Sequence, residues 1–275
     1  MAPDEWTSTV VLGDGDLALI RPIRPSDAPA LAAFHERQSA ENRYLRYFSP
    51  KPRLDDKLLE RFTHVDMVDR AAFVVELHGE FVGWASYERW QQRDDAEVAF
   101  QVDDRHQGKG IATLLLEHLA ALARTNGITR FTAQTLGENR SMLSVFAKAG
   151  WPVHRTFDSG VVDVDFPLDE TAEFVDSLER REQRADSRAI ARILLPNSIA
   201  VIGASDAPAS IGATLWAHVA ADPNRRVYAV NPRLAAAGAQ LGAHTVYAAV
   251  TDIPDEVGLA VIAVPADTLA VVVDA

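Results

Sequence analysis

A glycine-rich stretch, Arg105 to Ala112 (RHQGKGIA), is the first part of the sequence whose residue types suggest chemistry. It follows an apolar run and precedes a long stretch whose apolar residues recur at helical spacing. A turn of this kind presents unpaired backbone N–H groups at the positive end of a helix dipole, and glycine lets an anion approach the main chain closely. The stretch therefore predicts an anion site, although the same glycines could serve only a tight turn between strand and helix.

The spacing of these glycines excludes the two commonest nucleotide motifs. Gly108-Lys109-Gly110 lacks the register of the P-loop and also lacks the Gly-x-Gly-x-x-Gly fingerprint of dinucleotide sites. The anion must therefore be identified from the residues around the loop.

Glu97 is the only carboxylate in the strand-like run 96–102 (AEVAFQV), just before the loop. The alternation of a strand puts Glu97, Ala99 and Gln101 on one face. A carboxylate in such a place could exchange protons with a substrate. Because Asp94 and Asp95 precede it, Glu97 could instead only begin the strand in solvent.

The elements expected around these residues form a mixed α/β domain. We predict a helix that begins near Pro29, with Ser26 or Asp27 as its N-cap. Trp84, Trp90 and Trp151 are expected in the core, although Trp90 could instead form a wall of an acceptor pocket. Asp103 and Asp104 are expected in a solvated turn. The other predicted strands are 17–23, 71–77, 81–90 and 129–136, and the other predicted helices are 111–127 and 139–150.

Composition limits the possible partners and cofactors. The 27 Lys and Arg residues against 39 Asp and Glu give a formal charge of −12, which argues against nucleic acid. With no cysteine, disulfides, thiolate zinc sites and cysteine nucleophiles are excluded, and the histidines show no metal-binding spacing. The acidic N-terminus lacks the features of a signal peptide, and no apolar run is long enough to span a bilayer. We therefore expect a soluble, cytoplasmic protein without a membrane partner or a bound metal; the oligomeric state is left open.

Two motifs resemble the GNAT family of N-acetyltransferases. Arg105-x-x-Gly108-x-Gly110 resembles its Gln/Arg-x-x-Gly-x-Gly/Ala motif, and residues 138–151 (ENRSMLSVFAKAGW) resemble its segment Asn...Leu-Tyr-x-Lys-x-Gly-Phe. The resemblance covers roughly residues 10–168 and implies a GNAT fold with a central mixed sheet and acetyl-CoA as co-substrate. It implies cofactor contacts at Val102, Gln107, Gly108, Lys109, Gly110, Ile111, Ala112 and Asn139.

The same resemblance implies a general base at Glu97. The family's tyrosine, which often protonates the leaving thiolate, is replaced by Phe146. That role is then unfilled, and either a water protonates the thiolate or no proton is needed, because a thiolate whose pKa is near 8.5 is already a good leaving group. The segment 42–50 (NRYLRYFSP) lies where the family places acceptor contacts, but helix-end packing explains it equally well.

The second part of the chain predicts another domain. After a charged, helical linker (169–195), three short apolar runs alternate with helical stretches, as in a parallel sheet of the Rossmann type. Residues 201–205 (VIGAS), 230–232 (VNP) and 263–266 (AVPA) resemble the CoA-binding domain of NDP-forming acyl-CoA synthetases. That resemblance implies CoA contacts at Gly203 and Ser205. We expect domains at 1–168 and 196–275, the second one truncated because the sequence ends inside an apolar run.

This combination of domains resembles bacterial Pat-type protein lysine acetyltransferases, with the acetyltransferase domain first. The resemblance implies a lysine of an AMP-forming acyl-CoA synthetase as the acceptor and a CoA-sensing role for the second domain. Two alternatives stay open at this point, acetylation of a small amine and a non-catalytic CoA-sensing module.

Overall fold

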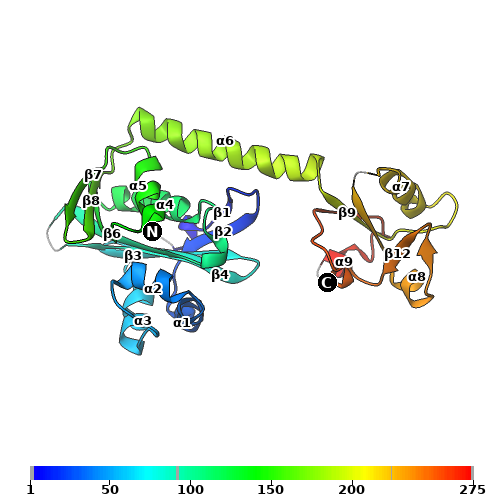
Figure 1. The fold of residues 1–275 in the computed structure, drawn as a ribbon, viewed down its shortest axis with the longest axis horizontal. Helices are drawn as coiled ribbons and strands as arrows, with labels where there is room; N and C mark the ends of the chain where they lie inside the picture. Colours follow the sequence, from blue (N-terminus) through cyan, green and yellow to red (C-terminus); the bar gives the residue numbers. More distant parts are fainter. Residues whose placement is uncertain (1–2, 91–92, 224, 274–275) are drawn as a thin grey trace. The chain divides into compact units, whose positions relative to one another are not determined.

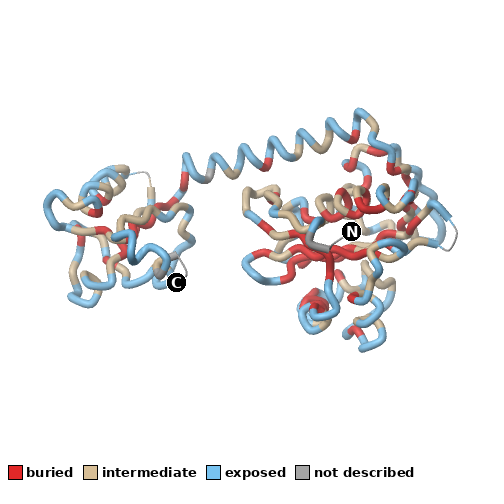
Figure 2. The backbone as a smooth tube through the Cα atoms, turned by 180° about the vertical axis from the view of Figure 1, so that it is seen from behind, coloured by how far each residue is buried: buried red, intermediate tan, exposed pale blue. Residues whose placement is uncertain are grey.

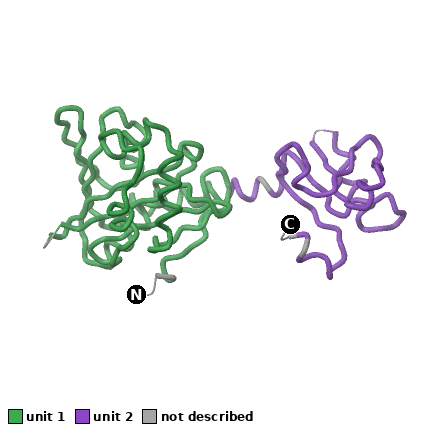
Figure 3. Tube along the Cα trace, turned by 90° about the horizontal axis from the view of Figure 1, so that it is seen from below, with its two compact units in different colours: residues 1–186 green, residues 187–275 purple. Residues whose placement is uncertain are grey.

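The computed structural model describes residues 3–90, 93–223 and 225–273. The chain forms two compact units, residues 1–186 and residues 187–275, coloured separately in Figure 3. Each unit has its own buried apolar clusters. The predicted α/β class is confirmed for both units.

The first unit is built on a mixed sheet. In its described residues the strand order is β1-β2-β3-β4-β5-β6-β8-β7, and all neighbours are antiparallel except β5 and β6. Short connections join β1 to β2, β3 to β4 and β4 to β5, whereas three helices lie between β2 and β3. The helix Ile111–Thr125 (α4) is the crossover that makes β6 parallel to β5. The strands are Ser8–Val11 (β1), Leu17–Pro22 (β2), Arg70–Leu77 (β3), Glu80–Arg89 (β4), Asp95–Val102 (β5), Arg130–Leu136 (β6), His154–Asp158 (β7) and Val161–Pro167 (β8).

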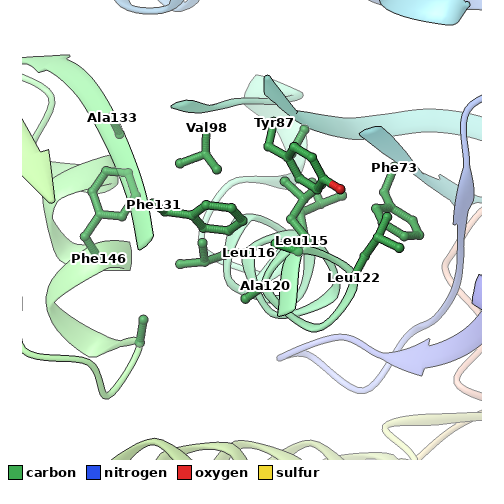
Figure 4. Close-up of a cluster of buried hydrophobic side chains, with 14 of the residues drawn as sticks. Phe73, Tyr87, Val98, Leu115, Leu116, Ala120, Leu122, Phe131, Ala133 and Phe146 are labelled. Carbon is green, nitrogen blue, oxygen red and sulfur yellow. The ribbon is translucent and has the colours of Figure 1, made fainter. Parts of the chain in front are cut away.

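Helices cover both faces of this sheet (Figure 1). One face carries Ala28–Glu36 (α1), Ala40–Tyr47 (α2) and Asp56–Thr63 (α3), and the other carries Ile111–Thr125 (α4) and Arg140–Lys148 (α5). The central strands are therefore buried on both sides, which Figure 2 shows as continuous red segments. Side chains of β5, β6, α4 and α5 interlock in the larger core, where Phe131 and Val98 lie close to Leu116 (Figure 4).

The start of α1 differs from the prediction. The helix begins after Asp27, but neither Ser26 nor Asp27 caps it with a side chain. The Asp27 carboxylate accepts hydrogen bonds from the Arg21 guanidinium at 2.7 and 3.0 Å and from the Arg24 amide at 2.7 Å. The Asp27 carboxylate, which local sequence predicts as the cap of α1, therefore binds the buried Arg21 instead.

The second unit contains a mainly parallel sheet. In its described residues the strand order is β11-β12-β10-β9-β13, with β12, β10, β9 and β13 parallel and β11 antiparallel to β12. The strands are Ser198–Ile202 (β9), Arg226–Val230 (β10), Gln240–Leu241 (β11), His244–Tyr247 (β12) and Leu259–Ile262 (β13). The helices are Ile211–Ala220 (α7), Pro232–Ala236 (α8) and Leu269–Val273 (α9), and Ala172–Leu194 (α6) precedes the sheet.

None of the helices in the described residues combines the length and apolar character that crossing a membrane requires. Within the same residues, no three His, Asp or Glu side chains gather as a metal site would need.

Candidate functional site

The parallel strands β5 and β6 separate part-way along their length. Their ladder joins Asp95 with Arg130, Ala96 with Phe131, and Glu97 with Thr132, and it ends there. β5 nevertheless continues to Val102, paired on its other side with β4. The carboxyl-terminal halves of β5 and β6 therefore border an opening in the middle of the sheet, beside Glu97.

Backbone groups of β5 line this opening. The Asp103 amide donates to the Val82 carbonyl at 2.9 Å, which fixes its direction toward β4. Because successive amides of a strand point to opposite sides, the amides of Val102 and Phe100 point toward the opening. The Val102 carbonyl, on the same side, accepts a hydrogen bond from Asn42 of α2 at 2.8 Å. An extended ligand in the opening could pair with these groups as an added strand would.

The glycine loop lies at the end of β5 and begins α4. Gly108 and Gly110 have φ values of +79° and +87°, and Gly110 is the N-cap of α4. A Cβ at either glycine would meet no atom within 4 Å, so the space over the loop is open. Across the described parts of the chain, the amides of Gly108, Gly110 and Ala112 donate to no protein acceptor. The loop thus presents free donors at a helix N-terminus, as an anion site requires.

The Lys109 side chain turns away from this space. Its ammonium group contacts Asp14 at 2.6 Å and Asp16 at 3.3 Å, and its carbonyl accepts from the Gly13 amide at 2.7 Å. Gln107 is exposed, and its side-chain amide donates to Asp104 at 3.3 Å.

The structure favours a second register of the glycine motif. Gln107-x-x-Gly110-x-Ala112 also fits Gln/Arg-x-x-Gly-x-Gly/Ala, and it places the motif glycine at the helix N-cap. Arg105, the first residue of the predicted register, binds Asp103 instead, through Nε and Nη2 at 3.0 Å each. The N-cap of α4 has a φ of +87°, a conformation that glycine adopts readily.

Asp103 is buried, so the prediction of a solvated turn is wrong for this residue. Its side chain is 3% exposed, and Arg37 of α1 also donates to it at 2.9 Å. Burial raises the pKa of Asp103, but the hydrogen bonds from Arg105 and Arg37 outweigh burial and hold this pKa well below its usual value. The carboxylate ties α1 to the start of the glycine loop.

Glu97 lies on the face predicted from alternation. Ala96 and Val98 are buried against the core on one side, whereas Glu97 is partly exposed on the side of α2 and α3. Its neighbour across β4 is Glu88, an exposed residue whose carboxylate binds Arg61 at 2.6 Å. Glu97 itself forms no ion pair with any residue that the structure describes. It is a carboxylate at the mouth of the opening, accessible to a substrate.

Helix α2 brings an arginine and a tyrosine to the same place. The Arg46 guanidinium lies 5.0 Å from the centre of the Tyr47 ring and 5.5 Å from the Trp84 ring. Burial lowers the pKa of Arg46, while the nearby charges of Tyr47 and Glu97 oppose this. Sequence reasoning named the segment 42–50 but not Arg46, since only the fold brings it beside Glu97.

Phe146 and Asn139 have structural neighbours of their own. Phe146 is 1% exposed, and its ring centre lies 6.1 Å from that of Phe100 and 5.7 Å from that of Phe166. In Figure 4 it lies beside Ala133 in the core. Phe146 has no group that could donate a proton to a leaving thiolate. The Asn139 side chain caps α5 by accepting from the Met142 amide at 3.0 Å.

Trp90 is 52% exposed, so its assignment to the core is wrong, whereas Trp84 and Trp151 are buried as predicted. It lines a polar hollow at the end of β4, together with Glu88 and Arg89. About half of the Trp90 side chain is therefore accessible to a partner, at the end of the sheet where the β5–β6 ladder begins.

In the second unit, Gly203 and Ser205 follow β9 at its carboxyl end. The later strands β10 and β13 lie on opposite sides of β9, so the order of the strands reverses at β9. Ligands of open parallel sheets bind at the carboxyl ends of the strands where such a reversal occurs. Gly203 has φ +89°, and a Cβ there would come within 2.4 Å of the Ala263 carbonyl. The Ser205 hydroxyl accepts from the Ala207 amide at 3.0 Å and shapes the turn before α7.

Comparison with known proteins agrees with this geometry. Residues 18–151 match the model of the acetyltransferase (GNAT) domain family, and residues 197–275 match that of the CoA binding domain family. The acetyltransferase PA5475 of Pseudomonas aeruginosa is 30% identical over 159 residues, which cover 56% of this chain and 84% of the relative. The chain belongs to the GNAT family of acetyltransferases.

Two further relatives match part of the chain. The crystal structure of the GNAT domain of S. lividans PAT is 44% identical, with a TM-score of 0.58, and the match covers 61% of this chain and 99% of that one. The acetyltransferase Pat of Mycolicibacterium smegmatis is 32% identical over 165 residues, 58% of this chain. The match spans only 49% of that relative's length. This GNAT protein is thus an N-acetyltransferase that uses acetyl-CoA, with a CoA-binding domain after it.

Proposed function

We propose that this GNAT protein is a protein lysine N-acetyltransferase in which Glu97 is the general base. The observation that carries the proposal is the position of Glu97 as the last residue of β5 that pairs with β6, on the strand that leads into a cofactor-type loop. The relatives named PAT and Pat support a protein acceptor. We further propose that the acceptor is an active-site lysine of an AMP-forming acyl-CoA synthetase.

The proposed cofactor contacts divide between two elements. The amides of Gly108 to Ala112 would hold the pyrophosphate of acetyl-CoA, since they are free donors at a helix N-terminus. The amides of Phe100 and Val102 would pair with the pantetheine arm and the thioester oxygen. Contacts of Gln107 and Asn139 with the cofactor are also part of the proposal.

Acetyl-CoA supplies a thioester carbonyl, and the protein must supply a neutral amine. A lysine side chain has a pKa near 10.4 in water, so a group close to it must take a proton before or during attack. Glu97 would accept that proton as the amine nitrogen bonds to the carbonyl carbon. The bond from carbon to sulfur then breaks, and CoA leaves as its thiolate without help from Phe146.

The acceptor is tested by mixing the chain with acetyl-CoA and an AMP-forming acetyl-CoA or acetoacetyl-CoA synthetase. We expect acetylation of one active-site lysine, identified by mass spectrometry, and inactivation of the synthetase, because acetylation removes the charge of that lysine. If the chain acetylates small amines but no protein, the acceptor is a small molecule and the proposed protein acceptor is wrong. If acetyl-CoA binds but no amine is acetylated, the chain is a sensor and the proposal fails.

The base is tested with Glu97→Gln, and Glu88→Gln is its matched control. The two residues lie opposite each other on neighbouring strands and carry the same side chain, but Glu88 is bound to Arg61. We expect kcat to fall about 100-fold or more in Glu97→Gln, the usual range for loss of a general base, and to change little in Glu88→Gln. Equal effects in the two variants would remove Glu97 from this role.

A further inference from the structure

Arg46 is unusual among the arginines around the opening of the sheet. Its Nε atom is buried and has no hydrogen-bond partner in the described part of the protein. The guanidinium group is held instead by aromatic rings, Tyr47 at 5.0 Å and Trp84 at 5.5 Å. Two rings fix the position of this group without satisfying its donors.

Other arginines near Arg46 all have oxygen partners. Arg37 binds Asp103 at 2.9 Å, Arg61 binds Glu88 at 2.6 Å, and Arg43 donates to the carbonyls of Glu36 and Gln38 at 3.1 and 2.6 Å. Arg46 forms no ion pair with any described residue, although acidic residues outnumber basic ones in the chain. A guanidinium N–H withdrawn from water without a partner is costly, and an arginine fork matches the geometry of planar anions such as carboxylates.

The position of Arg46 indicates when it would gain a partner. Helix α2 packs against β5 and β6, and Asn42, one turn before Arg46, reaches the Val102 carbonyl at the opening. Arg46 is also close enough to Glu97 for their charges to interact, yet the two form no ion pair. A substrate whose amine approaches Glu97 would therefore place its neighbouring groups beside Arg46.

We propose that Arg46 binds a carboxylate that a substrate carries close to the reacting amine, and that it thereby selects acidic acceptors. This inference rests on the proposed function only in taking Glu97 as the place where the amine reacts. The carboxylate belongs to the acceptor, as an acidic residue beside the target lysine would provide. An acyl group that ends in a carboxylate could bring the same chemistry from the side of CoA, and the experiment separates these two sources.

The binding test uses the full chain saturated with CoA and follows arginine Nε–H signals by ¹⁵N NMR. The Arg46 signal is assigned from its loss in Arg46→Lys. We expect 6-aminohexanoate to shift this signal in a saturable way and hexylamine, which lacks the carboxylate, to leave it unchanged. If the signal instead responds only when succinyl-CoA replaces CoA, the carboxylate comes from the acyl chain. If neither compound moves it, the proposal is wrong.

The transfer test compares lysine peptides that differ only in Glu or Gln beside the lysine. We expect kcat/KM to be about tenfold higher for the Glu peptide, as one charge-assisted hydrogen bond provides, and this preference to disappear in Arg46→Gln and Arg46→Met. Arg43→Gln removes a charge from the same helix and should keep the preference. A preference that survives in Arg46→Gln would overturn the assignment.

The two tests also separate this inference from the proposed function. If the NMR signal responds to 6-aminohexanoate but no peptide is acetylated, the carboxylate site stands and the lysine acceptor fails. If peptides are acetylated with no influence of the neighbouring carboxylate or of Arg46, the acetyltransferase function stands and the carboxylate site fails.

Discussion

Glu97 on β5 and Thr132 on β6 form the last pair of the parallel ladder between these strands. Beyond this pair the backbone groups of β5 that face away from β4 have no strand to bind. The same residue thus marks the end of the ladder and carries the carboxylate. The Glu97 carboxylate therefore lies next to the β5 backbone groups that an extended cofactor would bind. Proton transfer and cofactor binding can take place at neighbouring positions of the same strand.

Gly110→Ala should weaken the binding of acetyl-CoA by about tenfold, because a residue with a side chain resists the φ of +87° that orients the loop amides. It should also lower Tm by about 2–4 °C, for roughly 1 kcal/mol of strain. Gly127→Ala is the matched control, since Gly127 has φ +74° and open space around its Cβ position, at the other end of α4. Calorimetry should show equal losses of stability, and only Gly110→Ala should lose affinity.

Asp103→Asn should destabilise the first unit by about 2–3 kcal/mol, because two guanidinium groups lose a buried carboxylate. The value lies below that of a fully buried pair because Arg105 is 57% exposed. Urea unfolding at neutral pH measures the change. Wild-type stability in Asp103→Asn would show that the contact of α1 with the loop does not depend on this charge.

The same carboxylate predicts how stability depends on pH. The folded state holds the pKa of Asp103 below its unfolded value of about 3.9, so the folded state is favoured above that pH and loses this advantage as the pH falls further. Unfolding curves measured from pH 6 down to pH 3 should therefore show a steeper loss of stability for the wild type than for Asp103→Asn. Parallel curves would contradict the assignment.

Phe146→Tyr restores the tyrosine of the related motif without restoring its role. The ring lies in an aromatic cluster with Phe100 and Phe166, where a hydroxyl finds few partners. We expect a loss of about 1–2 kcal/mol in stability and no gain in kcat. A rise in kcat with acetyl-CoA would instead show that protonation of the thiolate limits the wild-type reaction.

Gly203→Ala should damage the second unit selectively. Its Cβ would overlap the Ala263 carbonyl at 2.4 Å, and φ is +89°, so β9 and the segment after β13 would have to move apart. We expect a cost of about 3 kcal/mol or more and loss of CoA binding by this unit, while acetyl transfer by the first unit continues. Gly238→Ala, with φ +64° and open space, is the control that should retain CoA binding.

Sequence reasoning located the elements with clear alternation or helical spacing. The strands around 71–77, 81–90 and 96–102 and the helix after the glycine loop were predicted within a few residues, because each has a distinct apolar face. The hairpin of β7 and β8 was not predicted. All residues of β7 are exposed, so its sequence carries no alternation, and only pairing with β8 makes it a strand.

The candidate site was predicted only as far as local sequence determines it. Glu97 and the glycine loop are adjacent along the chain, and strand alternation gave the face of Glu97 correctly. Asp103 was misjudged because its partner Arg37 is 66 residues away and is brought to it by the fold. Arg46 was missed for the same reason, since its place beside Trp84 and Glu97 depends on how α2 packs on the sheet.

The ion pairs of Lys109 with Asp14 and Asp16 have a consequence for the dependence of binding on ionic strength. The loop's only lysine is already neutralised by two aspartates, so a phosphate bound there would meet backbone dipoles rather than a free cation. Dissolved salt screens interactions between separated charges much more than short hydrogen bonds to amides. The affinity of the chain for acetyl-CoA should therefore change little in concentrated salt, whereas a site built on unpaired lysines would lose affinity.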